Sequence, residues 1–359
     1  MAEEAVSPLV DGSAPLEEES AGQNISEEMV SLLGDGSVCS VPLYVGCWAW
    51  GDDKSVWGWD HTKRAPGYDA YDKGLTENSI AAAFNASLSS GVTVFDTAEA
   101  YGTGLSEQLV GQLVRQARQE GKTVYVATKF SAHLWGREAV KPAMMKAARE
   151  SCRRLGLENI DLYQIHNPGH PSGITAQAHA LADVYQSGLA RSVGVSNFSV
   201  AELQELLLVF NQRGVPLASN QVEFSLLRQI PLEDGMKTLL DEVGAKLLAY
   251  SPLAMGRLTG KYSAQKPPPG RRGFSNLPWQ QIQPVVDELV AIGQVHGKTP
   301  AQVALNWVIC QGVIPIAGAK NQSQASENAG ALGWRLSPQE VARLGVLGQR
   351  GGYSNWQHG

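Results

Sequence analysis

The stretch "VTVFDTAEAYG", residues 92–102, runs from apolar β-forming residues straight into a carboxylate. The apolar run shows no alternation with polar residues, as expected of a strand that is buried on both faces. It ends at Asp96, and Tyr101 follows five residues later, immediately before a glycine. A single strand that ends in this way is more typical of a carboxylate that caps a turn, so its meaning depends on the rest of the chain.

Eight apolar runs of this kind alternate with amphipathic, helix-like stretches from about residue 40 onward. The runs are "VPLYVGCW", "VTVFDTA", "TVYVATKF", "IDLYQIH", "RSVGVSN", "LASNQVEF", "AKLLAYSPL" and "GVIPIAGA". Consecutive parallel strands require a crossover between them, which a helix usually provides. Eight such units in roughly 300 residues are the number and size typical of a TIM barrel. The sequence therefore predicts an α/β fold with a single (β/α)8 barrel.

A doubly wound open sheet is the competing architecture. It would normally carry a G-x-G-x-x-G turn after its first strand. The nearest match, Gly102-Thr103-Gly104, follows the second strand and lacks the third glycine. Two long loops interrupt the repeat, residues 49–74 after strand 1 and residues 255–278 after strand 7. In a barrel, both loops would lie on the face that binds ligands.

Acidic residues are concentrated at the N-terminus. Residues 1–35 contain nine Asp or Glu and no Lys or Arg, whereas the rest of the 359-residue chain contains 26 acids and 29 bases. A segment of low hydrophobicity and high net charge does not bury enough apolar surface to fold. We therefore expect a disordered acidic tail over residues 1–38, with one short helix over "NISEEMVSLL", and a barrel domain over residues 39–350.

Composition and charge argue against several functional classes. The net charge of −6 disfavours nucleic acid as the main partner, and no apolar run is long enough to span a membrane. The four cysteines form no C-x-x-C pair, which fits reduced thiols in an intracellular protein. The N-terminus lacks a secretory signal and the basic character of a transit peptide. We expect a cytoplasmic monomer, although a plastid protein whose transit peptide has been removed would look much the same.

Metal catalysis is not expected. His166 and His170 are four residues apart, but Pro168 and Gly169 between them prevent a helical turn that would align the two rings. No His-x-His pair ends a strand, so the sequence predicts no metal site.

Three neighbouring strands of the predicted barrel end in polar side chains. Strand 2 ends in Asp96, with Tyr101 on the following loop, strand 3 ends in Lys129, and strand 4 ends in His166. Each residue alone has an ordinary structural explanation, such as a lysine whose stem covers apolar surface. In a barrel, however, the four side chains would converge at one mouth. They are therefore candidate catalytic residues.

The four side chains fit one kind of chemistry. A phenol has a reference pKa of about 10, and a nearby ammonium lowers that pKa by favouring the phenolate. Asp96 would keep Lys129 charged and in place, and His166 would bond to the substrate oxygen or share its proton. Tyr101 is then a candidate general acid toward a developing alkoxide, which points to reduction of a carbonyl group. No side chain donates hydride, so a nicotinamide cofactor must supply it.

Seven segments also resemble the aldo-keto reductase family in their order and spacing. They are "FDTAEAYG", "ATKF", "LYQIHNP", "VGVSNFS", "SNQVEFSLL", "AYSPLAMGRLTGKY" and "PIAGAKNQSQASENAGAL". The resemblance covers about residues 40–345 and is nearest to the plant and microbial branch that includes pyridoxal reductases. It implies an NADP-dependent oxidoreductase of the alcohol dehydrogenase type, with a catalytic tetrad of Asp96, Tyr101, Lys129 and His166.

The resemblance further implies that NADPH is the cofactor. The implied contacts are Ser196, Asn197, Gln221, Tyr250, Ser251, Leu253, Gly256, Leu258, Lys261, Gly318, Lys320, Gln324, Glu327 and Asn328. The first three would bind the carboxamide, and Tyr250 would stack on the nicotinamide ring. The five contacts from Ser251 to Lys261 would lie where the family holds the pyrophosphate, and Glu327 and Asn328 would lie on the adenine side. Lys320 and Gln324 would meet the 2′-phosphate, and Lys320 favours NADPH over NADH because a 2′-hydroxyl offers no charge partner. From the residues alone, Ser196–Asn197 is equally consistent with a helix N-cap, and Tyr250 with a core aromatic.

The end of strand 1 and the loop after it contain Trp48, Trp50, Trp57 and Trp59, of which Trp48 and Trp50 are our candidates for substrate contact. In the family the substrate pocket lies near this loop and is often aromatic. We therefore hypothesise a flat aromatic carbonyl compound, pyridoxal-like or quinone-like, as the substrate. The alternative is that these side chains only anchor a long loop, since large aromatic groups require apolar surroundings.

Two other hypotheses are compatible with the sequence. Some members of this family are regulatory subunits that bind NADPH tightly and turn over slowly, and the acidic tail would then dock a partner protein. An unrelated barrel lyase or isomerase would use Lys129 to form a Schiff base with its substrate. The main hypothesis needs only a small carbonyl substrate as partner, with neither nucleic acid nor membrane involved.

Overall fold

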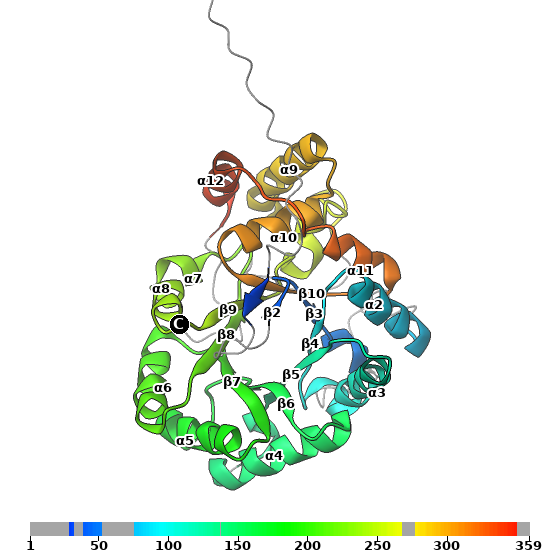
Figure 1. Ribbon diagram of the computed structural model, residues 1–359. Coiled ribbons are helices and arrows are strands. Elements are labelled where there is room, and N and C mark those ends of the chain that lie inside the picture. The colour runs from blue at the N-terminus through cyan, green and yellow to red at the C-terminus, as the bar shows by residue number, and fades with distance from the viewer. Residues whose placement is uncertain (1–28, 32–38, 52–74, 137, 268–276, 350–359) are drawn as a thin grey trace, which may run out of the picture.

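The computed structural model describes residues 29–31, 39–51, 75–136, 138–267 and 277–349. Eight parallel strands close into a barrel in the order β10-β3-β4-β5-β6-β7-β8-β9 (Figure 1). Their bounds are β3 Tyr44–Gly46, β4 Val94–Asp96, β5 Tyr125–Phe130, β6 Ile160–Ile165, β7 Ala190–Ser196, β8 Leu217–Glu223, β9 Lys246–Tyr250 and β10 Ile314–Gly318. Each coincides with one of the eight apolar runs, so the predicted (β/α)8 barrel is confirmed.

Helices surround the barrel and connect its strands (Figure 1). They are α2 Glu77–Ser89, α3 Leu105–Gln119, α4 Val140–Leu155, α5 Gly173–Gln186, α6 Val200–Arg213, α7 Ile230–Glu233, α8 Met236–Glu242, α9 Trp279–His296, α10 Pro300–Cys310, α11 Gln322–Ala329 and α12 Pro338–Leu347. Capping boxes at Thr76, Ser199, Thr299 and Ser337 start α2, α6, α10 and α12. They satisfy backbone N–H groups that the first helical turn leaves without a partner. Within the described part of the chain, no helix has both the length and the apolar character needed to cross a membrane.

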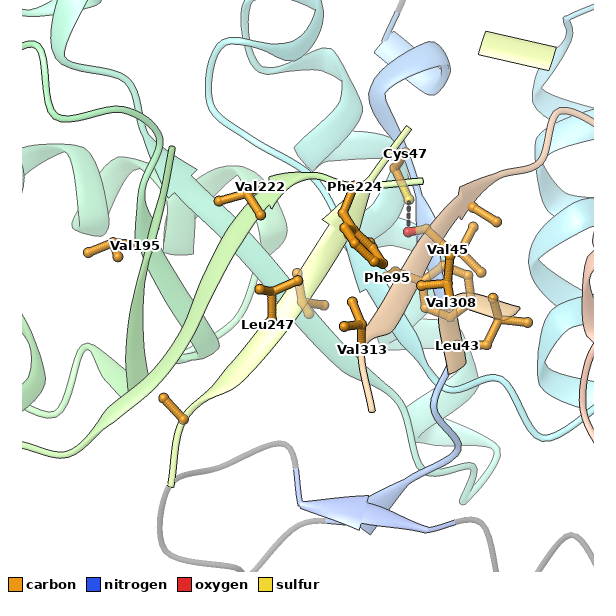
Figure 2. Close-up of a cluster of buried hydrophobic side chains, with 14 of the residues drawn as sticks. Leu43, Val45, Cys47, Phe95, Val195, Val222, Phe224, Leu247, Val308 and Val313 are labelled. Carbon is orange, nitrogen blue, oxygen red and sulfur yellow. Dashed lines mark hydrogen bonds between the residues drawn. The ribbon is translucent and has the colours of Figure 1, made fainter. Parts of the chain in front are cut away.

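Side chains alternate along each strand, so the barrel has two separate apolar regions. One set forms the interior cluster: Tyr44, Val94, Ala127, Leu162, Ala218, Leu248, Ile314 and Ile316. The other set packs against the helices, and Figure 2 shows part of it around Phe95 and Phe224. Phe95 stacks on Phe84 of α2, and Phe224 stacks on Trp307 of α10, with ring centroids 4.4 and 5.6 Å apart. The outward face therefore holds the helices, and the inward face fills the barrel.

A two-stranded antiparallel sheet precedes the barrel. Strand β1 (Val30–Ser31) pairs with β2 (Cys39–Ser40), and Val30 packs against the interior cluster. The prediction of a short helix over "NISEEMVSLL" is wrong for Val30 and Ser31. These two residues are extended, because they pair with β2 and because Val30 packs against apolar surface. Residues 1–28 and 32–38 of the predicted tail lie outside the described residues, as do 52–74 and 268–276 of the two long loops. The division at residue 38 therefore stays a prediction.

Candidate active site

The alternation that fills the barrel interior also aims polar side chains into the mouth formed by the carboxyl ends of the strands. Three members of the interior cluster are Val94 on β4, Ala127 on β5 and Leu162 on β6. Two residues further along the same strands are Asp96, Lys129 and Gln164. Because side chains two apart share a face, these three point inward one layer nearer the mouth. All three are at most 3% exposed.

Asp96 and Lys129 form a buried ion pair in this layer. Lys129 Nζ lies 2.5 Å from Asp96 Oδ1 and donates a second hydrogen bond to the backbone carbonyl of Thr97 at 2.8 Å. The other carboxylate oxygen, Oδ2, accepts from Gln221 Nε2 at 2.9 Å and from Gln164 Nε2 at 3.4 Å. A buried ion pair is tolerated only when its remaining polar atoms are also bonded, and this network bonds them.

Tyr101 begins a 3-10 turn, η4 (Tyr101–Gly104), in the loop after β4. Its hydroxyl lies 3.5 Å from Lys129 Nζ, and its ring meets the His166 ring edge-on, with centroids 5.6 Å apart. Gly102 lets this turn approach the preceding loop, because its φ is 61° and a Cβ there would lie 2.0 Å from the carbonyl oxygen of Gly51. Only glycine fits such a position, which explains the Tyr-Gly pair in the sequence.

The charges of these groups follow from their surroundings. Burial alone would lower the pKa of Lys129, but Asp96 and Tyr101 outweigh it and raise that pKa, so Lys129 is an ammonium. Burial, reinforced by Lys129, lowers the pKa of His166 well below its usual value, so the imidazole is neutral near pH 7. Burial raises the pKa of Tyr101 and outweighs the lowering effect of Lys129. The predicted net lowering of the phenol pKa is therefore wrong, because the sequence does not reveal how deeply the hydroxyl is buried.

The structure thus brings the four candidate catalytic residues together and adds two side chains that the sequence analysis missed. Gln164 contacts Asp96, and Ser131 Oγ lies 2.9 Å from His166 Nδ1. Gln164 follows Leu162 by two residues, and Ser131 follows Lys129 by two. The period-two pattern of inward-facing residues was therefore the signal that would have found both.

Three predicted cofactor contacts form a hydrogen-bonded group beside the tetrad. Asn197 Nδ2 donates to Ser196 Oγ at 3.1 Å and to the backbone carbonyl of His166 at 3.0 Å. The Tyr250 hydroxyl donates to Asn197 Oδ1 at 3.0 Å. Gln221, the fourth residue assigned to the nicotinamide end, bonds Asp96 through its side chain and accepts from Ser196 Oγ at its backbone carbonyl.

The two structural alternatives for these residues do not hold. Helix α6 is capped by Ser199, whose side chain accepts from Glu202 N, so Ser196 and Asn197 are not its N-cap. Tyr250 is partly exposed at the end of β9 rather than enclosed in the core. Both findings leave these side chains at the ends of β7 and β9, at the mouth.

The loop after β9, which carries the predicted pyrophosphate contacts, has an unusual backbone. Among the described residues, the non-glycine positions with positive φ are Thr103, Asn197, Ser251, Ala254 and Met255. All five lie in loops that follow β4, β7 or β9, at the mouth. Strained backbone of this kind gathers at active sites and ligand clamps. Gly256 continues the strained stretch with a φ of 91°, and the buried Leu258 anchors it.

The start of α11 orders the residues predicted to meet the 2′-phosphate. Asn321 is the N-cap, and its side chain accepts from the backbone N–H of Gln324 at 3.0 Å. Gln324 Oε1 in turn accepts from the backbone N–H of Lys320 at 2.8 Å. Lys320 therefore precedes a well-capped helix N-terminus, where the helix dipole and the lysine would both attract an anion.

The remaining predicted contacts connect α11 to its neighbours. Asn328 Nδ2 donates to the backbone carbonyl of Gly318 at 3.1 Å, which holds α11 against the end of β10. Lys261 Nζ lies 3.8 Å from Glu327 Oε2, so the loop after β9 and α11 carry opposite charges at this point. Leu253 is partly buried and packs against the main core. These contacts place the residues along one side of the mouth.

The two candidate substrate tryptophans have different environments. Trp50 is 2% exposed, donates its indole N–H to the backbone carbonyl of Ala319 at 2.7 Å and packs 5.9 Å from Phe95. Its position fits the anchoring role that the sequence left open. Trp48 is 41% exposed on η2 (Trp48–Gly51) and remains a candidate for substrate contact. Trp57 and Trp59 lie outside the described residues.

A metal site would need a group of His, Cys, Asp or Glu side chains around one point. Across the described ranges, no three or more His, Cys, Asp or Glu side chains form a group able to hold a metal ion. His170 uses Nδ1 to accept a backbone hydrogen bond from Ser172 at 3.1 Å.

Comparison with known proteins agrees with this geometry. Residues 43–347 match the Aldo/keto reductase family. The chloroplastic pyridoxal reductase of Arabidopsis thaliana is 36% identical over 323 residues, which cover 86% of this chain and 83% of the relative. The glycerol dehydrogenase of Gluconobacter oxydans is 26% identical with a TM-score of 0.75, covering 93% of this chain and all of the other. An aldo/keto reductase of Klebsiella pneumoniae, solved with NADP and acetate, is 26% identical with a TM-score of 0.69, covering 92% and 99%.

The family match spans most of the chain, and the Arabidopsis relative shares more than a third of its residues over most of both sequences. The Klebsiella and Gluconobacter structures share the fold of this chain. The chain therefore belongs to the aldo/keto reductase family.

Proposed function

We propose that the chain is an NADPH-dependent reductase, of the NADP-linked alcohol dehydrogenase type, that converts an aldehyde or ketone into an alcohol with Tyr101 as the general acid. The observation that carries the proposal is the buried array in which the Lys129 ammonium is fixed by Asp96 and lies 3.5 Å from the Tyr101 hydroxyl. A neutral imidazole, His166, lies against the same phenol. This arrangement supplies a proton donor, a fixed positive charge and a neutral hydrogen-bonding group at one point.

The raised pKa of Tyr101 is compatible with this role. The phenol keeps its proton until a carbonyl oxygen beside it becomes basic, which happens when the carbon accepts hydride. The phenolate that forms is then stabilised by Lys129, whose charge is already in place and needs no reorganisation. Asp96 takes no part in proton transfer and holds Lys129 as an ammonium.

The mouth fits a phosphorylated dinucleotide. The loop after β9 has several residues with positive φ, α11 begins with a capped N-terminus whose dipole favours an anion, and Lys261 and Lys320 add positive charge. We assign the nicotinamide end to Ser196, Asn197, Gln221 and Tyr250, and the phosphate and adenine ends to the loop after β9 and α11. When bound, the reduced cofactor supplies the hydride that no side chain can donate. The Klebsiella structure, which shares this fold and was solved with NADP, supports the assignment.

For the substrate we propose an aromatic aldehyde of the pyridoxal class. The named activity of the Arabidopsis relative supports this class, and so does the exposed indole of Trp48 at the mouth. Trp50 is not included, because its indole is enclosed and bonded to Ala319. A monomer in the cytoplasm stays part of the proposal, although the similar pyridoxal reductase is named as chloroplastic.

The two alternative functions make different demands on the same residues. A Schiff-base lysine must be a neutral amine at working pH. Asp96 and Tyr101 raise the pKa of Lys129, which argues against a lyase or isomerase of that kind. A regulatory subunit that binds NADPH without fast turnover would retain the whole tetrad, so only turnover distinguishes it from a reductase.

The test is NADPH oxidation by the purified chain with pyridoxal, 4-nitrobenzaldehyde, methylglyoxal and a quinone, each as sole substrate. We expect turnover that is fastest with pyridoxal or 4-nitrobenzaldehyde. Tight NADPH binding without turnover of any carbonyl would support the regulatory function instead. Absence of NADPH binding would contradict the proposal altogether.

A further inference from the structure

One polar residue of the "FDTAEAYG" stretch has no role in the chemistry described above. Glu99 lies between Asp96 and Tyr101 in the sequence and is 5% exposed. Its Oε1 accepts from the backbone N–H of Ser131 at 2.6 Å and from Trp135 Nε1 at 3.1 Å. Glu99 therefore joins the loop after β4, which carries the phenol, to the loop after β5.

Ser131 stands between Glu99 and the imidazole of His166. Its side chain is fully buried, and its Oγ lies 2.9 Å from His166 Nδ1. Among the described residues, Nδ1 is the only acceptor that this hydroxyl contacts. A buried hydroxyl that donates to no acceptor loses stability, so Ser131 donates to Nδ1 rather than accepting from it. Nδ1 is then unprotonated, and the single proton of the neutral imidazole is on Nε2.

We propose that Ser131 and Glu99 are positioning residues for His166. Ser131 selects the imidazole tautomer with its proton on Nε2, and Glu99 holds Ser131 in the place where it can do so. In this tautomer Nε2 donates a hydrogen bond, so His166 presents a donor to the substrate oxygen beside the Tyr101 hydroxyl. The inference rests on the proposed reductase function for its effect on rate, but the hydrogen bond itself does not depend on that function.

The surroundings of Glu99 explain why it also responds to pH. Arg154 of α4 lies 4.0 Å from Glu99 Oε2 but bonds at 2.5 Å to Glu107 of α3, so Glu99 has only a distant cation. Tyr163 of β6 also faces it and is a neutral phenol, because burial raises its pKa far above the usual value. Burial raises the pKa of Glu99 to about 7, even though Ser131 and Trp135 lower it. Near neutral pH, part of the protein therefore carries a protonated Glu99, which is a weaker acceptor for Ser131.

The rate kcat should fall as the pH falls. As pH falls through about 7, Glu99 gains its proton and its hold on Ser131 weakens. Burial lowers the pKa of His133, near His166, below its usual value, so the Glu99→Gln variant is needed to separate the effect of Glu99 from that of His133. We expect kcat of the wild type to include a fall on this acidic side, and Glu99→Gln to remove it, because the amide oxygen still accepts from Ser131 but does not titrate.

The experiment combines nitrogen NMR of histidine-labelled protein with steady-state kinetics. His166 is identified among the seven histidines by the signal lost in His166→Gln. We expect the wild-type signal to show one neutral tautomer with the proton on Nε2, and Ser131→Ala to mix the two tautomers. Ser131→Ala should lower kcat about tenfold, the effect of one lost hydrogen bond, with KM within about threefold.

Asp161→Asn is the control for Glu99→Gln. Asp161 is a buried carboxylate of β6 that bonds Arg118 and the backbone N–H of Val126 but not Ser131. It should change stability without moving the pH profile of kcat or the His166 signal. An Nδ1-protonated His166 in the wild type, or a Ser131→Ala protein with an unchanged signal and unchanged kcat, would overturn the proposal. So would equal effects of Glu99→Gln and Asp161→Asn on the pH profile. If no carbonyl is turned over, the reductase proposal fails, and the NMR result still decides the hydrogen bond.

Discussion

The floor and the mouth of the barrel interior are built by residues two apart on the same strands, yet the floor is apolar and the mouth is charged. On β4, β5 and β6 the floor is Val94, Ala127 and Leu162, which belong to the apolar interior cluster. One layer up are Asp96, Lys129 and Gln164, which are as deeply buried but bonded into a charged network. The floor gains stability from burial of apolar surface, whereas the mouth holds two desolvated charges that stability alone does not require. The candidate catalytic residues therefore lie in the layer where polar side chains replace apolar ones on the inward face of the strands.

The largest expected effect comes from removing the cation at the mouth. Lys129→Met should lower kcat about 10³-fold, because the phenolate loses its preorganised positive charge. It should also destabilise the fold by about 3–5 kcal/mol, since Asp96 would be buried without its partner. Single-turnover NADPH oxidation and urea unfolding measure the two effects. Lys122→Met is the control, because Lys122 lies before the start of β5, is exposed and should matter to neither.

A change at the floor should separate stability from chemistry. Leu162→Ala should lower the free energy of unfolding by about 2–5 kcal/mol through the cavity it leaves. Because Leu162 is one layer below Gln164, kcat per folded molecule should stay within about threefold. A large loss of kcat without a loss of stability would show that the two layers are not independent.

The stability of the protein should depend on pH through the titration of Glu99. The folded pKa of about 7 is above the usual value of 4.5, so the folded state holds this proton more tightly than the unfolded state. The free energy of unfolding should therefore fall as pH rises from about 4.5 to about 7, by at most about 3 kcal/mol. Glu99→Gln should flatten this part of the curve in urea unfolding. An unchanged slope would mean that Glu99 is already ionised in the acid range.

The smallest expected effects distinguish the two tryptophans. Trp50→Phe keeps most of the packing but removes the hydrogen bond to Ala319, and should destabilise the protein by about 1 kcal/mol. Trp48→Ala should change stability by less than about 0.5 kcal/mol but raise KM for aromatic aldehydes while leaving methylglyoxal unaffected. Equal KM changes for both substrate types would remove Trp48 from the substrate pocket.

The fold could be predicted from the sequence because apolar runs and amphipathic helical stretches alternate regularly along the chain. All eight apolar runs became barrel strands, and their order predicted that Asp96, Lys129 and His166 would meet at one mouth. The side-chain environments were harder to predict, because they depend on contacts between distant segments. Trp50 is enclosed through Ala319, 269 residues away in the chain, and burial decides the direction of the Tyr101 pKa shift. The contact of Ser131 with His166 could be found only once the pairing of β5 with β6 was known.

The central claim is that Tyr101 donates the proton that completes carbonyl reduction. Its most direct test is Tyr101→Phe, with Tyr185→Phe on the outer helix α5 as the matched control, assayed for pyridoxal-dependent NADPH oxidation and for NADPH binding by fluorescence. We expect Tyr101→Phe to abolish turnover while NADPH affinity stays within about threefold, and Tyr185→Phe to behave as the wild type. Turnover by Tyr101→Phe at the wild-type rate, or loss of NADPH binding together with activity, would contradict this claim.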